Sequence, residues 1–164
     1  MPIFAKFAIK ERGPAPRGFA KMINELKRDS WEATGAHFHE EMRDNRFTQA
    51  HATKAGYGER KRRYVWRKFK EEGHTRPLEK SGETRELVRR YGTLKATSTN
   101  NSSQVRIAYP GARKIKFRHT KSTINMAEEF TTITQGEADK LAQVFDNELD
   151  KRLRQKSWIK GFSY

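Results

Sequence analysis

The sequence predicts one domain of the α+β class. We expect a small antiparallel β-sheet packed against a long N-terminal and a long C-terminal helix, with an extended basic arm over residues 44–80. Three observations predict this arrangement: strand-like alternation near the start and in the middle of the chain, helical spacing of apolar residues towards both ends, and a very basic stretch between them. The length of 164 residues suits a single domain, residues 1–164, because typical domains run to roughly 100–150 residues.

The first quarter of the chain alternates and then becomes helical. Apolar side chains at every second position predict a half-buried β-strand over residues 3–9, and the Gly- and Pro-rich residues 12–18 end it. Spacing of three and four residues then predicts a helix over residues 19–43, with a kink near residues 29–35. Its apolar positions are Phe19, Met22, Ile23, Leu26, Ala33, Phe38 and Met42.

The middle of the chain contains a basic helix and a hairpin. Residues 60–70 are rich in Arg and Lys, which are good helix formers, and Gly73 is expected to end that helix. Ser81 is predicted to cap a short helix. Two alternating runs, residues 93–99 and 104–109, flank a polar turn and therefore predict a β-hairpin.

The last third of the chain is predicted to hold two short strands and a long helix. The strands are expected at residues 115–117 and 130–133, with a loop between them. Thr134 followed by Glu137 is a capping-box pattern that predicts the start of a helix. The expected apolar stripe of that helix is Ala138, Leu141, Ala142, Phe145, Leu149 and Leu153.

The composition excludes several classes of protein. The 35 Lys and Arg residues outnumber the 20 Asp and Glu residues and give a formal net charge of +15 at pH 7. Such a charge favours acidic partners without choosing between nucleic acid and protein. No apolar run approaches the roughly 18 residues of a membrane-spanning helix, so no membrane partner is expected. The absence of Cys excludes disulfides, cysteine–zinc sites and thiol catalysis.

The basic arm supplies the first candidate surface. Its cations could neutralise phosphates while its aromatic rings stack on bases, or the rings could pack on another subunit, and charge alone favours neither. Ordering the backbone costs about 1–2 kcal/mol per residue, so this apolar-poor segment is expected to be mobile in the isolated protein. The candidate cations facing a partner or DNA are Arg60, Lys61, Arg62, Arg63, Arg67, Lys68 and Lys70. The candidate docking aromatics are Tyr64, Trp66 and Phe69.

The second candidate surface is an aromatic tail over residues 157–164. The helical stripe ends before it, and Gly161 disfavours continuation of the helix. We expect the tail to dock in a groove of a neighbouring subunit, because buried aromatic anchors dominate interfaces. The alternative is that the tail folds back onto its own sheet. Its docking residues are Trp158, Ile159, Phe162 and Tyr164.

No catalytic, metal-binding or cofactor-binding residues are expected. His37 and His39 lie two positions apart, so on a helix they point away from each other and are a poor pair of metal ligands. The sequence contains no nucleophile elbow, phosphate-binding loop or dinucleotide-binding glycine motif. We therefore expect the chain not to be an enzyme and to bind no cofactor.

Several short motifs occur in a characteristic order along residues 19–153. They are Phe47-Thr48, Ala55-Gly56-Tyr57, the basic stretch with Tyr64 and Lys68, Gly73-His74, Pro77-Leu78, Ser81-Gly82-Glu83-Thr84-Arg85 and the segment 125–134. This order resembles the phage virion morphogenesis family, the tail-completion and head–tail joining (neck) proteins of tailed bacteriophages. The chain departs from the family pattern at Glu83-Thr84, where the family often places Arg directly after Gly.

The resemblance implies a structural protein of the virion. The expected assembly is a homo-oligomeric ring, a hexamer, at the neck or tail end, present in the host cytoplasm during assembly. It implies connector, tail-terminator or tail-tube proteins as neighbours, and no catalytic residue or cofactor. The positive charge would then face either an acidic protein surface of the adjoining ring or packaged DNA, and the sequence favours neither. The alternative function is a basic RNA- or DNA-binding protein that uses the helix over residues 60–70.

Overall fold

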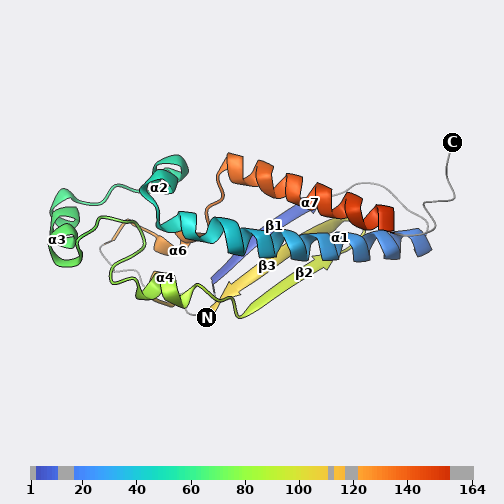
Figure 1. Cartoon of the computed structure of the whole chain (residues 1–164), viewed down its shortest axis with the longest axis horizontal. Helices are drawn as coiled ribbons and strands as arrows, with labels where there is room; N and C mark the ends of the chain where they lie inside the picture. The colour runs from blue at the N-terminus through green and yellow to red at the C-terminus, as the bar shows by residue number, and fades with distance from the viewer. Residues whose placement is uncertain (1–2, 11–16, 111–112, 117–121, 156–164) are drawn as a thin grey trace.

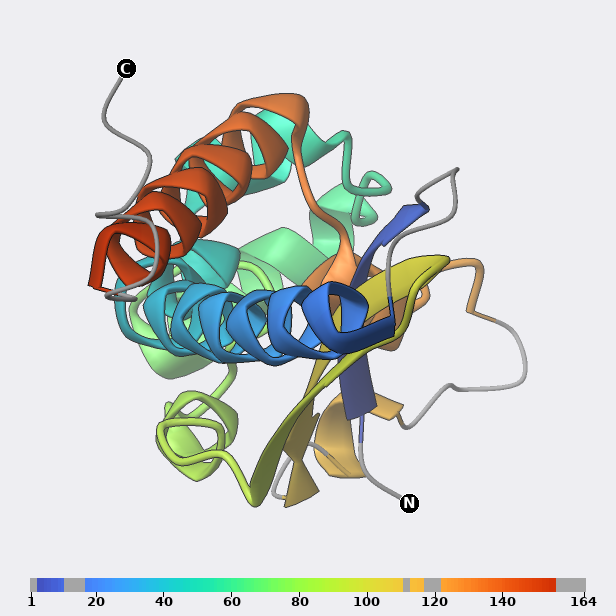
Figure 2. The same ribbon diagram turned by 90° about the vertical axis from the view of Figure 1, so that its right-hand side faces the viewer.

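Two long helices cover one face of a small sheet (Figure 1). The computed structural model describes residues 3–10, 17–110, 113–116 and 122–155, with side chains from residue 18 onward. Helices α1 (Arg17–His37) and α7 (Gln135–Gln155) pack together on the same side of the strands, as the view along the long axis also shows (Figure 2). The predicted α+β class, with its long N-terminal and C-terminal helices, is confirmed.

The sheet has three antiparallel strands in the order β1-β3-β2. Strand β1 (Ile3–Lys10) pairs along its full length with β3 (Ser102–Tyr109), and β2 (Thr93–Ser98) pairs with the other edge of β3. The predicted N-terminal strand and the predicted hairpin are both present, within one or two residues of the expected ends. Alternation of side chains therefore predicted the whole sheet.

The core lies between the sheet and the two long helices. Val105, Ile107 and Tyr109 occupy alternate positions of β3 and are fully buried. Val105 packs with Trp31 of α1 and Phe145 of α7, whose ring centroids lie 4.7 Å apart. A larger cluster extends from the sheet towards the short helices and contains Phe38, Met42, Phe47, Leu78, Val88, Ile107, Tyr109, Ile115, Phe130 and Leu141.

Helix α1 is continuous where the sequence predicts a kink. The hydroxyl of Ser30 donates to the Leu26 carbonyl at 2.8 Å, and that of Thr34 donates to the Ser30 carbonyl at 2.8 Å. Polar side chains in the helix interior are thus satisfied by the helix itself. A Cβ on Gly35 would lie 2.7 Å from Val105 Cγ2, so this glycine allows close approach of α1 to β3.

The chain changes direction only after α1 ends. A π-helical turn, η1 (Phe38–Met42), and a 3₁₀ turn, η2 (Arg43–Phe47), replace the last turns of the predicted helix. They lead into α2 (Gln49–Ala55), which Thr48 caps by accepting from the His51 amide at 3.2 Å. This bend carries the chain away from the sheet towards α3.

Two predicted strands are wrong. Residues 113–116 form a helical turn, α5 (Arg113–Lys116), which buries Ile115, and residue 117 lies outside the described residues. The segment predicted as strand 130–133 overlaps helix α6 (Met126–Thr131). Asn125 caps α6 by accepting from the Glu128 amide at 3.2 Å, so a local cap overrides the strand preference of Phe and Thr.

Helix α7 begins at the predicted capping box. The Thr134 amide donates to Glu137 Oε2 at 3.1 Å, and the Glu137 amide donates back to Thr134 Oγ1 at 3.4 Å. Leu141 and Phe145 are buried, and Leu149 is half-buried. Two members of the predicted stripe, Ala138 and Ala142, are instead exposed.

The predicted basic arm, residues 44–80, is shorter than expected. Phe47, Ala52 and Leu78 are buried, so both ends of that range belong to the core. Within residues 58–76 the single buried side chain is Lys68. We refer to residues 58–76, which carry α3 (Arg62–Glu72), as the α3 arm.

The short helix after the α3 arm is present but differently capped. Helix α4 (Glu83–Leu87) has Gly82 at its N-cap position, with φ of 82° and no side-chain cap. The predicted cap, Ser81, lies one residue too early. A glycine fits this position because a positive φ is strained for other residues.

Candidate interaction surface on helix α3

Helix α3 stands at one end of the molecule, beyond the end of the sheet (Figure 1). Seven of its eleven residues are Arg, Lys or Glu, and it is exposed on most sides. It ends where predicted: Gly73 adopts φ of 72°, and its amide donates to the Phe69 carbonyl at 2.9 Å. The left-handed residue closes the helix as glycine C-caps commonly do.

The inner side of α3 is held by Lys68. Its side chain is 7% exposed, and its ammonium group donates to the Arg76 carbonyl. Burial lowers the pKa of Lys68, and the nearby positive charge of Arg60 lowers it further. Lys68 therefore does not face a partner, contrary to the prediction from the basic run.

Arg60 attaches the α3 arm to helix α6. Both its terminal nitrogens bond the Glu129 carboxylate, with Nη1 2.8 Å from Oε1. Tyr57, just before the arm, donates its hydroxyl to the Glu129 carbonyl at 2.6 Å, and burial raises the pKa of Tyr57. Arg60 is thus an intramolecular anchor and not the outward-facing cation that the sequence predicts.

The outer side of α3 exposes aromatic rings. Trp66 is 64% exposed, Phe69 is 59% exposed and Tyr64 is 43% exposed. Lys70 Nζ lies 5.3 Å from the centroid of the Trp66 ring, and the Arg67 guanidinium lies 5.9 Å from that of Tyr64. Contacts of this length are favourable cation–π pairs. The three predicted docking aromatics are therefore at the surface, and Tyr64 and Trp66 each lie beside a cation.

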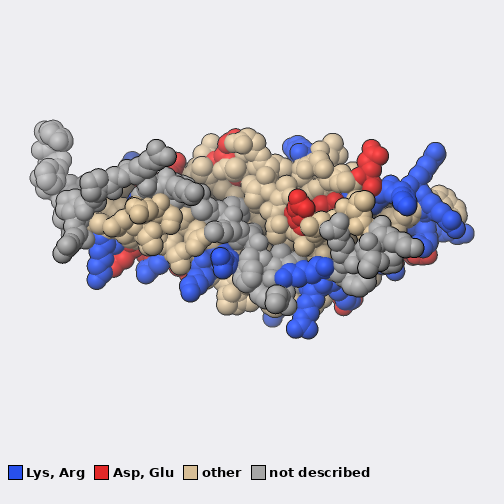
Figure 3. Space-filling model, turned by 180° about the vertical axis from the view of Figure 1, so that it is seen from behind, with Lys and Arg blue, Asp and Glu red and all other residues tan. Residues whose placement is uncertain are grey.

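The cations of α3 leave a positive charge on this end of the molecule. Lys61, Arg62 and Arg63 are exposed and have no acidic partner among the described residues. Arg67 has one partner, Glu71, at 3.9 Å. In the space-filling view from behind, basic side chains gather at this end and along one edge (Figure 3). We call the exposed set Arg62, Arg63, Trp66, Phe69 and Lys70 the α3 face.

A buried ion pair supports the base of the arm and was not predicted. Arg46 is fully buried, bonds the carboxylate of Glu137 and donates to the Thr132 carbonyl at 3.0 Å. Burial alone would raise the pKa of Glu137, but the hydrogen bond and charge of Arg46 outweigh it and hold that pKa below its usual range. His51 Nδ1 lies 3.6 Å from Glu137 Oε1. These contacts join η2, α2 and the start of α7.

A second buried network surrounds His39. Its Nε2 lies 2.9 Å from the Arg89 carbonyl, and its Nδ1 lies 3.1 Å from the Tyr109 hydroxyl. Arg43 Nη1 lies 3.2 Å from the same Nε2 and donates to the Arg89 carbonyl at 2.7 Å. Burial and the charge of Arg43 lower the pKa of His39. The His37–His39 pair binds no common partner, and the described residues include no metal-ligand cluster.

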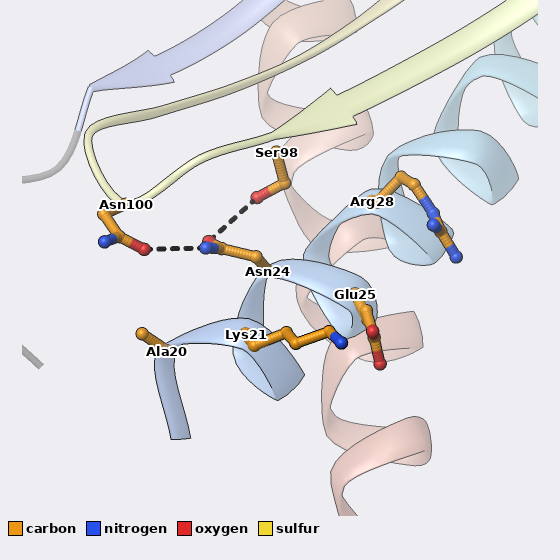
Figure 4. A pocket seen from close by; sticks show the side chains of 7 residues that line it. All are labelled: Ala20, Lys21, Asn24, Glu25, Arg28, Ser98 and Asn100. Atoms are coloured by element: carbon orange, nitrogen blue, oxygen red, sulfur yellow. Dashed lines mark hydrogen bonds between the residues drawn. The ribbon is translucent and has the colours of Figure 1, made fainter. Parts of the chain in front are cut away.

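A shallow hollow lies between the start of α1 and the β2–β3 turn (Figure 4). Asn24 Nδ2 donates to Asn100 Oδ1 at 2.7 Å, and the Ser98 hydroxyl donates to Asn24 Oδ1 at 3.4 Å. Its central polar groups therefore bond one another. These hydrogen bonds attach the hairpin to α1, and the hollow presents no converging groups for a substrate.

The four tail residues predicted to dock, Trp158, Ile159, Phe162 and Tyr164, lie outside the described residues. No helix in the described part of the chain is long and apolar enough to cross a membrane.

The described residues thus form an α+β domain with an exposed cationic and aromatic helix at one end. Comparison of the chain with protein-family models, curated proteins and solved structures gives no match.

Proposed function

We propose that this chain is a non-enzymatic assembly subunit of a bacteriophage virion. It acts at the head–tail interface as a neck or tail-completion ring subunit, and the α3 face is one of its docking surfaces. The observation that carries the proposal is the exposure of Trp66 and Phe69 on a helix held away from the core.

Exposed aromatic rings on a fixed helix suit docking to protein. A buried Trp or Phe removes about 150–250 Å² from water, and such rings near the centre of an interface supply much of its affinity. The rings of the α3 face contribute little to their own domain, because more than half of each side chain is exposed. Their burial by a partner therefore adds stability that the single chain lacks.

A second function, nucleic-acid binding, is favoured by the same helix. Arg62 and Arg63 are unpaired among the described residues, and the net charge is +15. Cations that neutralise phosphates with rings that stack on bases are typical of single-strand binding. We rank this function second because the two most prominent hollows of the described residues lie against α1 and not beside α3.

Disruption of the gene in the genome that encodes it tests the first function. We expect electron microscopy of the lysate to show separate heads and tails, or tails of abnormal length. Complementation with the intact chain should restore joined particles. Normal infectious particles from the disrupted genome would contradict the proposal.

Fluorescence anisotropy tests the second function. A 20-nucleotide single strand and a 20-base-pair duplex are titrated with the full chain at 50 and 200 mM salt. Nucleic-acid binding predicts a fall in affinity of about 10³-fold or more for six or more phosphate contacts. Weak binding at both salt concentrations would reject this function.

A further inference from the structure

Helix α7 carries an acidic stripe on its outer side. Asp139, Asp146 and Asp150 are all exposed, and at 3.6 residues per turn they lie on one line, opposite the buried Leu141 and Phe145. Lys140, the nearest cation in sequence to Asp139, lies about a quarter turn to one side.

The aspartates of this stripe are largely unpaired. Asp146 and Asp150 have no ion-pair partner among the described residues, and Asp139 accepts from Gln135 Nε2 at 2.8 Å. This is unexpected in a chain with 35 Lys and Arg residues and only 20 Asp and Glu residues. Three aligned carboxylates that have no ion-pair partner among the described residues are complementary in charge to a cationic surface.

The α3 face has the matching spacing. Arg63 and Lys70 are seven residues apart, as are Asp139 and Asp146, so each pair spans about 10.5 Å along its helix. When the two helices lie antiparallel, Arg63 meets Asp146 and Lys70 meets Asp139. Because both intervals are equal, both contacts form in the same register.

The centres of the two surfaces also fit. Trp66 lies between Arg63 and Lys70 and is 64% exposed. On α7 the position between the two aspartates holds Ala142, which is exposed although the sequence predicts it in the core. A small residue facing a large ring lets the helices approach closely. Surface ion pairs contribute little affinity each, so the ring supplies affinity and the charges set the register.

The two surfaces cannot meet within one molecule. Helix α3 lies at one end of the chain's long axis, and α7 runs from the middle towards the other end (Figure 1). The exposure of its three aspartates places the stripe on the outer side of α7. A contact between two different surfaces of identical chains repeats from copy to copy and closes into a ring or continues as a filament.

We propose that the α3 face of one copy docks antiparallel on the stripe of Asp139, Asp146 and Asp150 on α7 of the next copy, with Trp66 against Ala142. The occupant of each surface is a second copy of this chain. The proposal rests on the proposed function as an assembly subunit and names the contact by which subunits meet.

Charge reversal with a mixing arm tests this contact. One full-length variant carries Arg63→Glu and Lys70→Glu, and a second carries Asp139→Lys and Asp146→Lys. Sedimentation velocity at 100 mM NaCl measures self-association of each. We expect each variant alone to self-associate at least about tenfold more weakly than the natural chain.

An equimolar mixture should recover association. The Glu-bearing α3 of the first variant then meets the Lys-bearing α7 of the second. At the next contact, the natural α3 of the second variant meets the natural α7 of the first. A control variant, Lys21→Glu with Arg28→Glu, has the charge change of the first variant and the same seven-residue spacing on α1. At 100 mM NaCl it should lose far less self-association than either charge-reversal variant.

Three outcomes would overturn the proposal. The first is an equimolar mixture that associates no more strongly than either variant alone. The second is a natural chain that stays monomeric at every concentration. The third is a first variant that loses duplex binding while both variants still self-associate as strongly as the natural chain. None of these bears on the gene-disruption test, because unjoined heads and tails report the function whichever surfaces meet.

Discussion

Arg46 is a fully buried cation, and Glu137 is the carboxylate that it bonds. Glu137 also closes the capping box of α7. Removing one partner of a buried ion pair leaves the other charge without compensation and typically costs about 3–5 kcal/mol. One residue therefore couples the start of α7 to the turn that leads to the α3 arm.

We expect Glu137→Gln to lower the free energy of unfolding by about 3–5 kcal/mol, because the neutral amide keeps the shape but loses the charge facing Arg46. Urea denaturation at pH 7 measures it. Glu148→Gln is the control: Glu148 pairs with Lys151 at 3.3 Å and with Arg152 at 3.6 Å near the surface, where such a pair is worth about 0–1 kcal/mol. Equal losses in the two variants would contradict the structural role of Glu137.

Two buried histidines predict a loss of stability in mild acid. Burial, together with the positive charge of Arg43 or Arg46, lowers the pKa of His39 and of His51 below the ordinary value of 6.5. The unfolded chain then binds more protons than the folded one below about pH 6.5, so stability falls as pH falls. The pKa of Glu137 lies below its usual 4.5, so protonation of Glu137 lowers the stability further only at lower pH.

The measurement is the free energy of unfolding between pH 7.5 and 5.5. We expect His51→Gln to reduce its slope with pH, since the amide binds no proton. His37→Gln on α1, where the side chain is only half-buried, is the matched control. A slope of zero in the natural chain would contradict the burial of neutral histidines.

At the scale of elements, the α3 arm differs from the two long helices. Within residues 58–76 one side chain is buried, whereas α1 and α7 pack on each other and α1 packs on the sheet. Segments with few buried contacts open with little free-energy cost. Hydrogen exchange of the isolated chain should show weak protection of residues 62–72 and strong protection in α1. Equal protection would show that the arm is part of the cooperative core.

The rings of α3 and of the core should respond oppositely to substitution. We expect Trp66→Ala to change the melting temperature little, because the side chain is 64% exposed, and to weaken self-association. Phe47→Ala should cost about 3–5 kcal/mol of stability, because Phe47 is 1% exposed in the main cluster. Thermal unfolding and sedimentation velocity separate the two effects. A large loss of stability in Trp66→Ala would assign that ring to the domain itself.

At the scale of the whole molecule, periodic patterns predicted the sheet and the long helices, because half-buried elements repeat every two or every 3.6 residues. Residues 115 and 130 were predicted in strands because Ile and Phe favour them, but a helical turn buries Ile115 and a capped helix buries Phe130. The Arg46–Glu137 pair joins residues 91 apart, and no local sequence pattern predicts such a contact. The burial of Lys68 also depends on tertiary structure, so the sequence alone did not distinguish it from the exposed cations around it.

The net charge of +15 opposes every contact between copies, so salt affects self-association in two opposite ways. The Debye length is about 30 Å at 0.01 M salt and about 10 Å at 0.1 M. Added salt first screens repulsion between whole molecules, which acts over the longer distance, and then weakens the closer α3–α7 ion pairs. Self-association should therefore pass through a maximum near 100 mM NaCl and decline towards 500 mM.

Sedimentation velocity over 10–500 mM NaCl measures this curve. The Lys21→Glu, Arg28→Glu control reduces the net charge by four, so its maximum should move to lower salt while the decline above 100 mM is kept. Binding to a nucleic-acid polyanion behaves differently, because counterion release makes affinity fall continuously with the logarithm of salt. Self-association that rises steadily to 500 mM would show that apolar contacts alone hold the copies together, and that the aspartates of α7 contribute nothing to their register.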